Sequence, residues 1–526
     1  MVLWGGLRPI VSQVVADVFA LFVFSNAIVS KPSTRSSALM GAAAGVTIAY
    51  SGNLTNRWTV NFPMIPLIIL QMLRLFIPED KHRWISRILF ALSALLIFAS
   101  ACLCILFPAV ELAPMKSLGD YNVGVVDLYL PVKLHFTSPF ADTQHVVPSE
   151  QDHATIRILY PTVEEPMSIS YLRPRTSEVY CEENMKHSAP PPLRPYSWMI
   201  HGWRLIQVPA KHHATLASPP DKGFPVIFYS HGLGGSAEMY AYQTHALAAQ
   251  GYVVVVLDHT DGSAPVVSRK DGTLLRRNET ILEQWFNGFQ DEYRLSRQTM
   301  TAYRAQELLA VVEGVLRLNY ETLPELEESG LDFRNQLNSA DIHYMGHSFG
   351  GATALHAAKY RPPRSVLAHD PASDWLPTES RLSLFDVGRM KESTVNHTYW
   401  TRGGTVAVSA MEMEDNHENE KSVTLSLHDT TELLLLFSEE WYSKKWSGSD
   451  VLKDMHDRKV LGPVGGKSHF GVIHGAFHQE FSDACMLTPL WIAREVGLTG
   501  LRNPLDTAKE IHVETSSFLR GLQQGI

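Results

Sequence analysis

Cysteine is scarce in this chain, which has only 4 among its 526 residues. Cys102 and Cys104 fall within one apolar stretch, so only Cys181 and Cys485 remain for the rest of the chain. Two cysteines cannot build a disulfide framework, and they match no zinc-ligand spacing. The scarcity therefore argues against a disulfide-built fold and a cysteine metal site. It leaves open whether Cys181 and Cys485 pair with each other.

Positive charge is also in short supply. The chain has 45 Lys and Arg against 54 Asp and Glu, which gives a formal net charge of −9. Nucleic-acid-binding proteins concentrate basic side chains to neutralise phosphates, and no such concentration is present. We therefore expect no nucleic-acid partner.

Apolar stretches dominate the N-terminal region. Residues 88–107 contain no charged side chain, and roughly 20 apolar residues suffice to span a bilayer. Three more apolar stretches precede this one, at residues 11–29, 38–50 and 63–77. We predict a transmembrane region of about four helices over residues 1–115, followed by one large globular domain over residues 116–526.

The basic residues of this region are unevenly distributed between the predicted connections. One set of connections carries Lys31, Arg35, Lys81, Arg83 and Arg87, and the other carries Arg8, Arg57 and Lys116. The side that is richer in Lys and Arg is normally cytosolic. The pattern predicts a multi-pass membrane protein whose C-terminal domain, residues 116–526, is lumenal or extracellular.

Residues 346–350 read Gly-His-Ser-Phe-Gly and fit the G-x-S-x-G nucleophile elbow. The apolar run 342–345 predicts a strand before the turn, and residues 352–358 predict a helix after it. An elbow requires this context, because Ser348 must project from a sharp strand-to-helix turn. The flanking glycines, Gly346 and Gly350, remove side chains that would collide there.

An acid and a base can be sought downstream, in the order Ser, acid, His. Asp370 follows the apolar run 366–369 and is the candidate acid, with Asp374 and Asp386 as rivals. His478 is the candidate general base, with His474 as its local competitor. The spacing alone does not decide between these alternatives.

An oxyanion hole requires one N–H from the residue after the nucleophile and one from an earlier strand-helix loop. Phe349 supplies the first. Residues 225–230 predict a strand, and the His-Gly-Leu-Gly-Gly loop at 231–235 follows it, so Leu233 is the candidate for the second. The continuous apolar run 252–259 predicts a parallel strand buried on both faces. This order of elements predicts an α/β-hydrolase fold, a mostly parallel sheet flanked by helices.

Four segments together resemble one known family. Residues 228–235, 258–264, 346–353 and 478–483 are similar to plasma-type platelet-activating-factor acetylhydrolase, also called lipoprotein-associated phospholipase A2 or group VII. The resemblance covers roughly residues 120–525. It implies Ser348, Asp370 and His478 as a catalytic triad, with Leu233 and Phe349 as oxyanion donors. It also implies a calcium-independent esterase of short or oxidised sn-2 acyl groups on phospholipids, without metal or organic cofactor.

Two features of the sequence depart from this family. Two other functions are alternatives to phospholipid hydrolysis at the sn-2 position. The segment 410–470 is longer than its counterpart, and the N-terminal hundred residues have no equivalent in the secreted enzyme. A phospholipase A1 or a general lipid esterase could use the same fold, because fold does not fix substrate. A membrane-tethered binding protein with a dead hydrolase fold is the alternative of another class. The sequence indicates no oligomeric state.

Three further segments carry weaker expectations. The Pro- and His-rich residues 174–223 predict a long surface excursion. The acidic residues 413–420 predict a solvated loop, and their spacing matches no recognised metal-ligand set. Trp441 and Trp446, beside Lys444 and Lys445, predict packing in the core or on the surface, with contact to a lipid interface as the alternative.

Overall fold

The computed structural model describes most of the chain after residue 117 and scattered positions before it. The described residues are 118–138, 146–188, 197–279, 290–377, 398–401, 404–407, 431–457 and 468–524, with isolated positions between 8 and 111. None of the helices within these residues is both long and apolar enough to cross a bilayer. Apart from isolated positions, the four predicted membrane segments lie outside the described residues, as does the acidic loop at 413–420.

The chain divides into two compact units. One comprises Met1–Ala113 and Ser170–Val208, and the other comprises Pro114–Ile169 and Pro209–Ile526. We predicted a single boundary at residue 115. This domain boundary stays a prediction.

The segment predicted as a surface excursion contains regular structure. It includes helix α5 (Ser177–Ser188), the 3-10 helix η4 (Ser197–Leu205) and strand β6 (Gln207–His212). Cys181 of α5 is a buried free thiol that donates to the Ile200 carbonyl at 3.6 Å. Burial raises the pKa of Cys181 to about 12. The apolar residues of this segment are interspersed with Pro and His, so their periodicity is obscured in the sequence.

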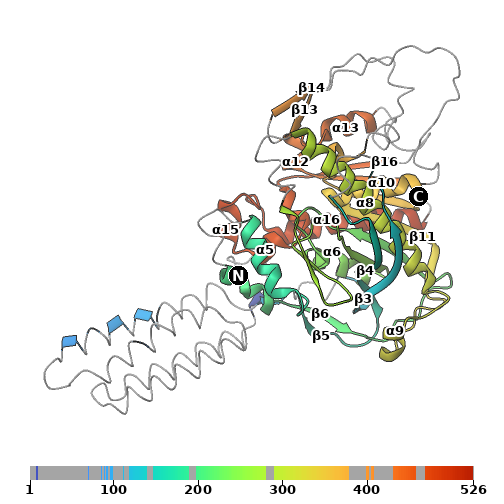
Figure 1. Cartoon of the computed structure of the whole chain (residues 1–526), viewed down its shortest axis with the longest axis horizontal. Helices are drawn as coiled ribbons and strands as arrows, with labels where there is room; N and C mark the ends of the chain where they lie inside the picture. The colour runs from blue at the N-terminus through green and yellow to red at the C-terminus, as the bar shows by residue number, and fades with distance from the viewer. Residues whose placement is uncertain are drawn as a thin grey trace. The chain divides into compact units, whose positions relative to one another are not determined.

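A large sheet runs through the second unit (Figure 1). From β3 onward, its strands lie in the order β3 (Asn122–His135), β4 (Glu150–Thr162), β8 (Val253–Asp258), β7 (Phe224–Ser230), β11 (Leu337–His347), β12 (Ser365–His369), β15 (Glu432–Ser438) and β16 (Ser468–Ile473). The pairs β3–β4 and β4–β8 are antiparallel, and every pair from β8 to β16 is parallel. The carboxyl ends of the parallel strands therefore meet at one edge, where open α/β sheets place their functional groups.

Helices cover both faces of this sheet. Helix α8 (Gln290–Arg317) packs on β3 and β7 and against α10 (Phe349–Tyr360), while α6 (Ala241–Ala249) packs on β4 and β8 and against α16 (Pro504–Gln524). The predicted hydrolase order of strand, oxyanion loop, helix, strand and elbow is confirmed.

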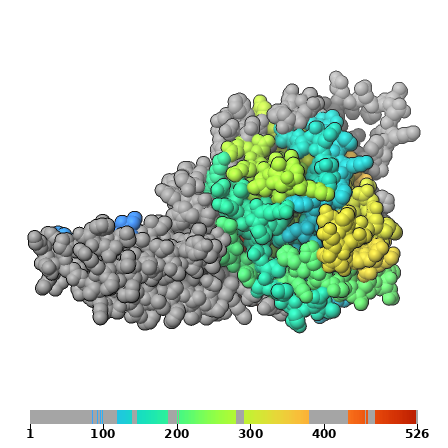
Figure 2. Space-filling model, turned by 60° about the horizontal axis from the view of Figure 1, so that its bottom comes forward, coloured from blue at the N-terminus to red at the C-terminus, as the bar shows by residue number. Residues whose placement is uncertain are grey.

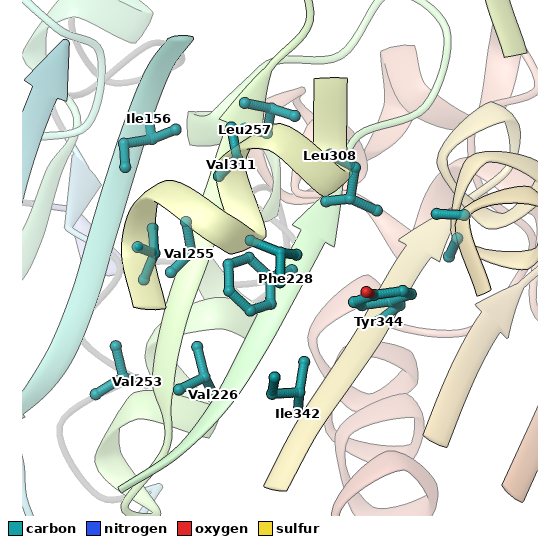
Figure 3. Packing of buried hydrophobic residues seen from close by; sticks show 14 of the residues in the cluster. Ile156, Val226, Phe228, Val253, Val255, Leu257, Leu308, Val311, Ile342 and Tyr344 are labelled. Carbon is teal, nitrogen blue, oxygen red and sulfur yellow. The ribbon is translucent and has the colours of Figure 1, made fainter. Parts of the chain in front are cut away.

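The packing of buried residues explains why the parallel strands have continuous apolar sequences. Val226 and Phe228 of β7 pack with Leu308 and Val311 of α8 in one cluster (Figure 3). The intervening Tyr229 lies on the opposite face of the strand, where its ring is 4.9 Å from that of Tyr240. Each buried Phe, Leu or Val side chain contributes about 1.5–3 kcal/mol relative to exposure, so a strand packed on both faces is apolar at every position.

Shorter elements complete the described structure. They are β1 (Arg8–Pro9), β2 (Val110–Glu111), β5 (Met167–Ser170), η5 (Ala237–Tyr240), β9 (Val266–Ser268), β10 (Leu274–Arg276), α9 (Pro324–Ser329), η6 (Ser373–Trp375), β13 (Thr398–Thr401), β14 (Gly404–Ala407), α12 (Glu439–Ser443), α13 (Ser449–Asp457), η8 (His478–Phe481), α14 (Ala484–Leu487) and α15 (Leu490–Glu495). On the face that Figure 2 shows, segments from the first two thirds of the chain, teal through yellow, form most of the described surface.

Candidate active site

Ser348 occupies a strained turn between β11 and α10. Its φ of 57° and ψ of −116° lie outside the regions that non-glycine residues usually adopt. A Cβ atom on Gly346 would lie 2.2 Å from the Gly350 carbonyl oxygen, and one on Gly350 would lie 1.9 Å from the Ser230 carbonyl oxygen. Both positions therefore require glycine. The tight turn leaves Ser348 at the carboxyl edge of the sheet with 7% of its surface exposed.

His478, the first residue of η8, connects Ser348 to Asp370. Its Nε2 lies 3.1 Å from Ser348 Oγ, and its Nδ1 lies 2.9 Å from Asp370 Oδ2. Because an ionised carboxylate can only accept, Nδ1 carries the proton and Nε2 is available to accept the hydroxyl proton. The competing His474 is 84% exposed at its side chain and lies 3.9 Å from Glu439. The structure thus brings His478 to the serine.

Three donors hold the carboxylate of Asp370, which follows β12 and is fully buried. Oδ1 accepts the N–H of Ser438 at 2.7 Å, and Oδ2 accepts the Ser438 hydroxyl at 2.7 Å in addition to His478. Burial raises the pKa of Asp370, and the hydrogen bonds from His478 and Ser438 oppose this shift. The convergence of donors fixes the orientation of the carboxylate toward the base.

The two rival acids have different outcomes. Asp374 lies in η6, where its Oδ1 accepts the Ser447 hydroxyl at 2.6 Å. Asp386 lies outside the described residues. Of the two candidates that the structure describes, Asp370 and not Asp374 reaches His478.

The predicted oxyanion donors belong to segments that adjoin the elbow. Phe349 is the first residue of α10, so its N–H has no acceptor within the helix. Leu233 follows β7, whose last residue Ser230 pairs with Gly346 of β11. Within the described part of the chain, the Leu233 N–H also has no hydrogen-bond acceptor. Both N–H groups are therefore available near Ser348.

Helix α12 lies against the base. The indole of Trp441 stacks on the imidazole of His478, with ring centroids 4.1 Å apart and planes inclined by 21°. Glu440 Oε2 accepts the backbone N–H of His478 at 3.0 Å. Ser438 caps the helix by accepting the Trp441 N–H at 3.1 Å while its hydroxyl donates to Asp370. One short helix thereby positions both the acid and the base.

Sequence reasoning did not single out Ser438 or Glu440, and it predicted only packing or lipid contact for Trp441. A usable signal was present for Ser438. It ends the apolar strand β15, which pairs with β12, and polar side chains at such strand ends converge at one edge of a parallel sheet. The contact between Trp441 and His478 had no sequence signal, because 37 positions of chain separate them.

His347 lies within the elbow and is buried beside the base. Its Nδ1 is 3.0 Å from the hydroxyl of Tyr240, and its ring centroid is 4.5 Å from that of His478. Burial holds the pKa of His347 well below its usual range, so this imidazole is neutral at neutral pH. Among the described residues, His347, Asp370 and His478 place potential metal-ligating atoms within 4.8 Å of one another. Within this group, Asp370 and His478 are hydrogen-bonded to each other, and His478 also contacts Ser348.

Comparison with known proteins finds one matching family model. Residues 150–371 match the family model described as platelet-activating factor acetylhydrolase, isoform II, and this range contains Leu233, Ser348 and Asp370. Over this range the chain is similar to the platelet-activating factor acetylhydrolase family. The family resemblance inferred from the four sequence segments is therefore confirmed, and the family is one of carboxylic ester hydrolases. The N-terminal region lies outside the matched range.

Individual relatives agree with this assignment. A platelet-activating factor acetylhydrolase from Gallus gallus is 28% identical over 165 residues, which cover 29% of this chain and 39% of that protein. The chain thus matches about two fifths of the length of that relative. A putative phospholipase A2 from Schizosaccharomyces pombe is 24% identical over 404 residues, which cover 72% of this chain and 84% of that protein.

Among solved structures, a ferulic acid esterase from Streptomyces cinnamoneus is similar with a TM-score of 0.46 and 15% identity, over 78% of this chain and 92% of that chain. The fold assignment rests on the sheet topology and the family match rather than on this likeness.

Proposed function

We propose that the protein is a serine esterase that hydrolyses phospholipids, with preference for short or oxidised sn-2 acyl groups. The observation that carries the proposal is the hydrogen-bonded chain from Ser348 through His478 to Asp370. The names of the family and of the relatives support a phospholipid as substrate. An acetylhydrolase must accept a short acyl group, which supports the preference for short acyl groups.

In the proposed mechanism, Ser348 attacks the ester carbonyl while Nε2 of His478 takes its proton. Asp370 maintains the Nδ1–H tautomer of the imidazole and stabilises the imidazolium that forms. The N–H groups of Leu233 and Phe349 bind the developing oxyanion, a contribution worth on the order of 3 kcal/mol per donor. The lysophospholipid leaves with the proton from His478, and water then hydrolyses the acyl-enzyme.

This mechanism requires no divalent cation, because the hydroxyl is activated by the imidazole. We therefore expect the esterase activity to persist when calcium is chelated. Loss of activity on chelation, restored by added calcium, would contradict this part of the proposal.

We also propose that the catalytic region is tethered to a membrane and faces a lumen or the exterior. The proposal is supported by the charge-free residues 88–107 and by the excess of Lys and Arg on one set of predicted connections. Labelling the full chain in sealed vesicles with a membrane-impermeant reagent tests the orientation of the catalytic region.

The decisive experiment is labelling with a fluorophosphonate probe, which reacts with activated serines. We expect the wild-type protein to be labelled and the Ser348→Ala variant to be unlabelled and inactive while remaining folded. Labelled protein that cleaves no phospholipid would replace the proposal with another esterase activity. A wild-type protein that is folded but unlabelled would favour the binding-protein alternative. Profiling of acyl chains and head groups then separates sn-2 from sn-1 hydrolysis.

A further inference from the structure

The peptide that carries the Leu233 N–H is held by its own carbonyl oxygen. This oxygen belongs to Gly232, and it accepts a hydrogen bond from Gly235 N–H at 3.1 Å and contacts His231 Nδ1 at 2.8 Å. In a trans peptide the C=O and N–H groups point in opposite directions. Whatever fixes the Gly232 oxygen therefore also fixes the direction of the Leu233 N–H.

The second contact requires a particular tautomer of His231, and the structure supplies it. The backbone N–H of His259 lies 3.2 Å from His231 Nε2 and can only donate to it. Nε2 must then be unprotonated, so the neutral imidazole carries its proton on Nδ1. Nδ1–H consequently donates to the Gly232 oxygen. His231 is fully buried, so water does not compete for this hydrogen bond.

A buried hydrogen-bond network fixes the orientation of His259 in turn. Its Nε2 is 2.7 Å from Ser230 Oγ, and its Nδ1 is 2.7 Å from Glu307 Oε2. Ser230, His259 and Glu307 have the connectivity of a catalytic triad. Each is entirely buried, so substrate cannot reach them, and they connect the ends of β7 and β8 to α8.

Arg304 connects this buried hydrogen-bond network to both oxyanion donors. Its Nη2 donates to the carbonyl oxygen of His231, and its guanidinium lies 4.3 Å from the centre of the Phe349 ring. Arg304 is fully buried and lies one turn before Glu307 on α8. The same helix therefore braces the loop that carries Leu233 and the residue that supplies the second N–H.

We propose that His231 is a positioning residue, whose Nδ1–H holds the Gly232–Leu233 peptide in the orientation that aims the Leu233 N–H at the oxyanion. The proposal rests on the esterase function proposed above. In this proposal, His231 stabilises the transition state indirectly, by orienting an oxyanion donor, and does not contact substrate. Its loss should lower kcat with little effect on KM, because the oxyanion exists only after the serine attacks.

Two substitutions in the full chain separate this role from simple packing. In His231→Asn the side-chain amide nitrogen can occupy the place of Nδ1, which retains the donor to the Gly232 oxygen. In His231→Gln the amide reaches the place of Nε2, which retains an acceptor for the His259 N–H and loses the donor. Gln is closer than Asn to His in size, so a packing role predicts that Gln is the better replacement.

We expect kcat of His231→Gln to fall about 10- to 100-fold, less than for complete removal of an oxyanion donor, because Gly235 N–H still holds the peptide. We expect His231→Asn to stay within about fivefold of wild type. KM should change little in both variants. An activity of His231→Gln equal to or above that of His231→Asn, with both variants folded, overturns the proposal.

Two controls keep the result interpretable. Ser348→Ala is measured in parallel, because wild-type hydrolysis that survives this change refutes the proposed function rather than the role of His231. Should neither His231 variant fold, the ring ¹⁵N shifts of His231 in the wild-type protein decide. A proton on Nδ1 supports the proposal, and a proton on Nε2 overturns it.

Discussion

Substitution of Asp370 by Asn tests the assignment of the acid most directly, because the structure determines how the new amide must be oriented. The Ser438 N–H that faces Oδ1 can only donate, so the Asn oxygen must take the Oδ1 position. The amide NH₂ group then takes the Oδ2 position and faces Nδ1 of His478. Nδ1 is forced to accept, and the ring proton moves to Nε2.

An imidazole protonated at Nε2 cannot take the proton of Ser348. Where an acid-to-amide change enforces the wrong tautomer, kcat falls about 10⁴-fold, which corresponds to about 5 kcal/mol in the activation free energy. The free energy of unfolding should change much less. The Ser438 hydroxyl, now 2.7 Å from an NH₂ group, can rotate from donor to acceptor and keep its hydrogen bond.

The assay is hydrolysis of a dispersed short-chain ester by purified Asp370→Asn, with thermal unfolding as the control for folding. The matched variant is Asp374→Asn, whose carboxylate accepts from Ser447 rather than from the base. We expect Asp374→Asn to retain activity within about tenfold of wild type, since it leaves the tautomer of His478 unchanged. A folded Asp370→Asn with near-wild-type kcat, or an Asp374→Asn that is equally inactive, would refute the reasoning.

Three further predictions concern the base, the buried network and the membrane. Trp441→Leu should lower kcat more than Trp441→Phe, because Phe retains a ring over His478; equal kcat values in steady-state assays would contradict a role for stacking. Burial raises the pKa of Glu307 from 4.5 to about 8. The contribution of Glu307 to the free energy of unfolding is therefore fully present below about pH 4.5 and is lost as pH rises through about 8. The unfolding midpoint of Glu307→Gln relative to wild type should therefore increase between pH 5 and 9, and a constant difference would exclude this ionisation. A chain that begins at residue 116 should hydrolyse dispersed esters as fast as the full chain. It should hydrolyse vesicle phospholipid more slowly, because the enzyme is no longer concentrated at the bilayer. Equal vesicle rates for the two forms, at matched active-site concentration, would show that residues 1–115 serve only localisation.

The amino-acid sequence by itself determined the elements that lie around the elbow. Glycines at 346 and 350 around Ser348 predicted the strand-turn-helix, because only residues without side chains fit a turn this tight. The fully apolar run ending at Asp258 predicted a strand with both faces covered, since a side chain on either face of such a strand must be buried. Four local segments sufficed to indicate the family resemblance.

Other features were decided only by the tertiary structure. The choice of Asp370 over Asp374 depends on Ser438, which is 68 positions further along the chain and reaches the carboxylate only because β12 and β15 pair. The stacking of Trp441 on His478 and the buried contacts of His231 with His259 likewise join residues from separate elements. Local patterning encodes which residues form a strand or a turn. It does not encode which polar atoms meet across the sheet edge, because that depends on register and on helix packing between distant segments.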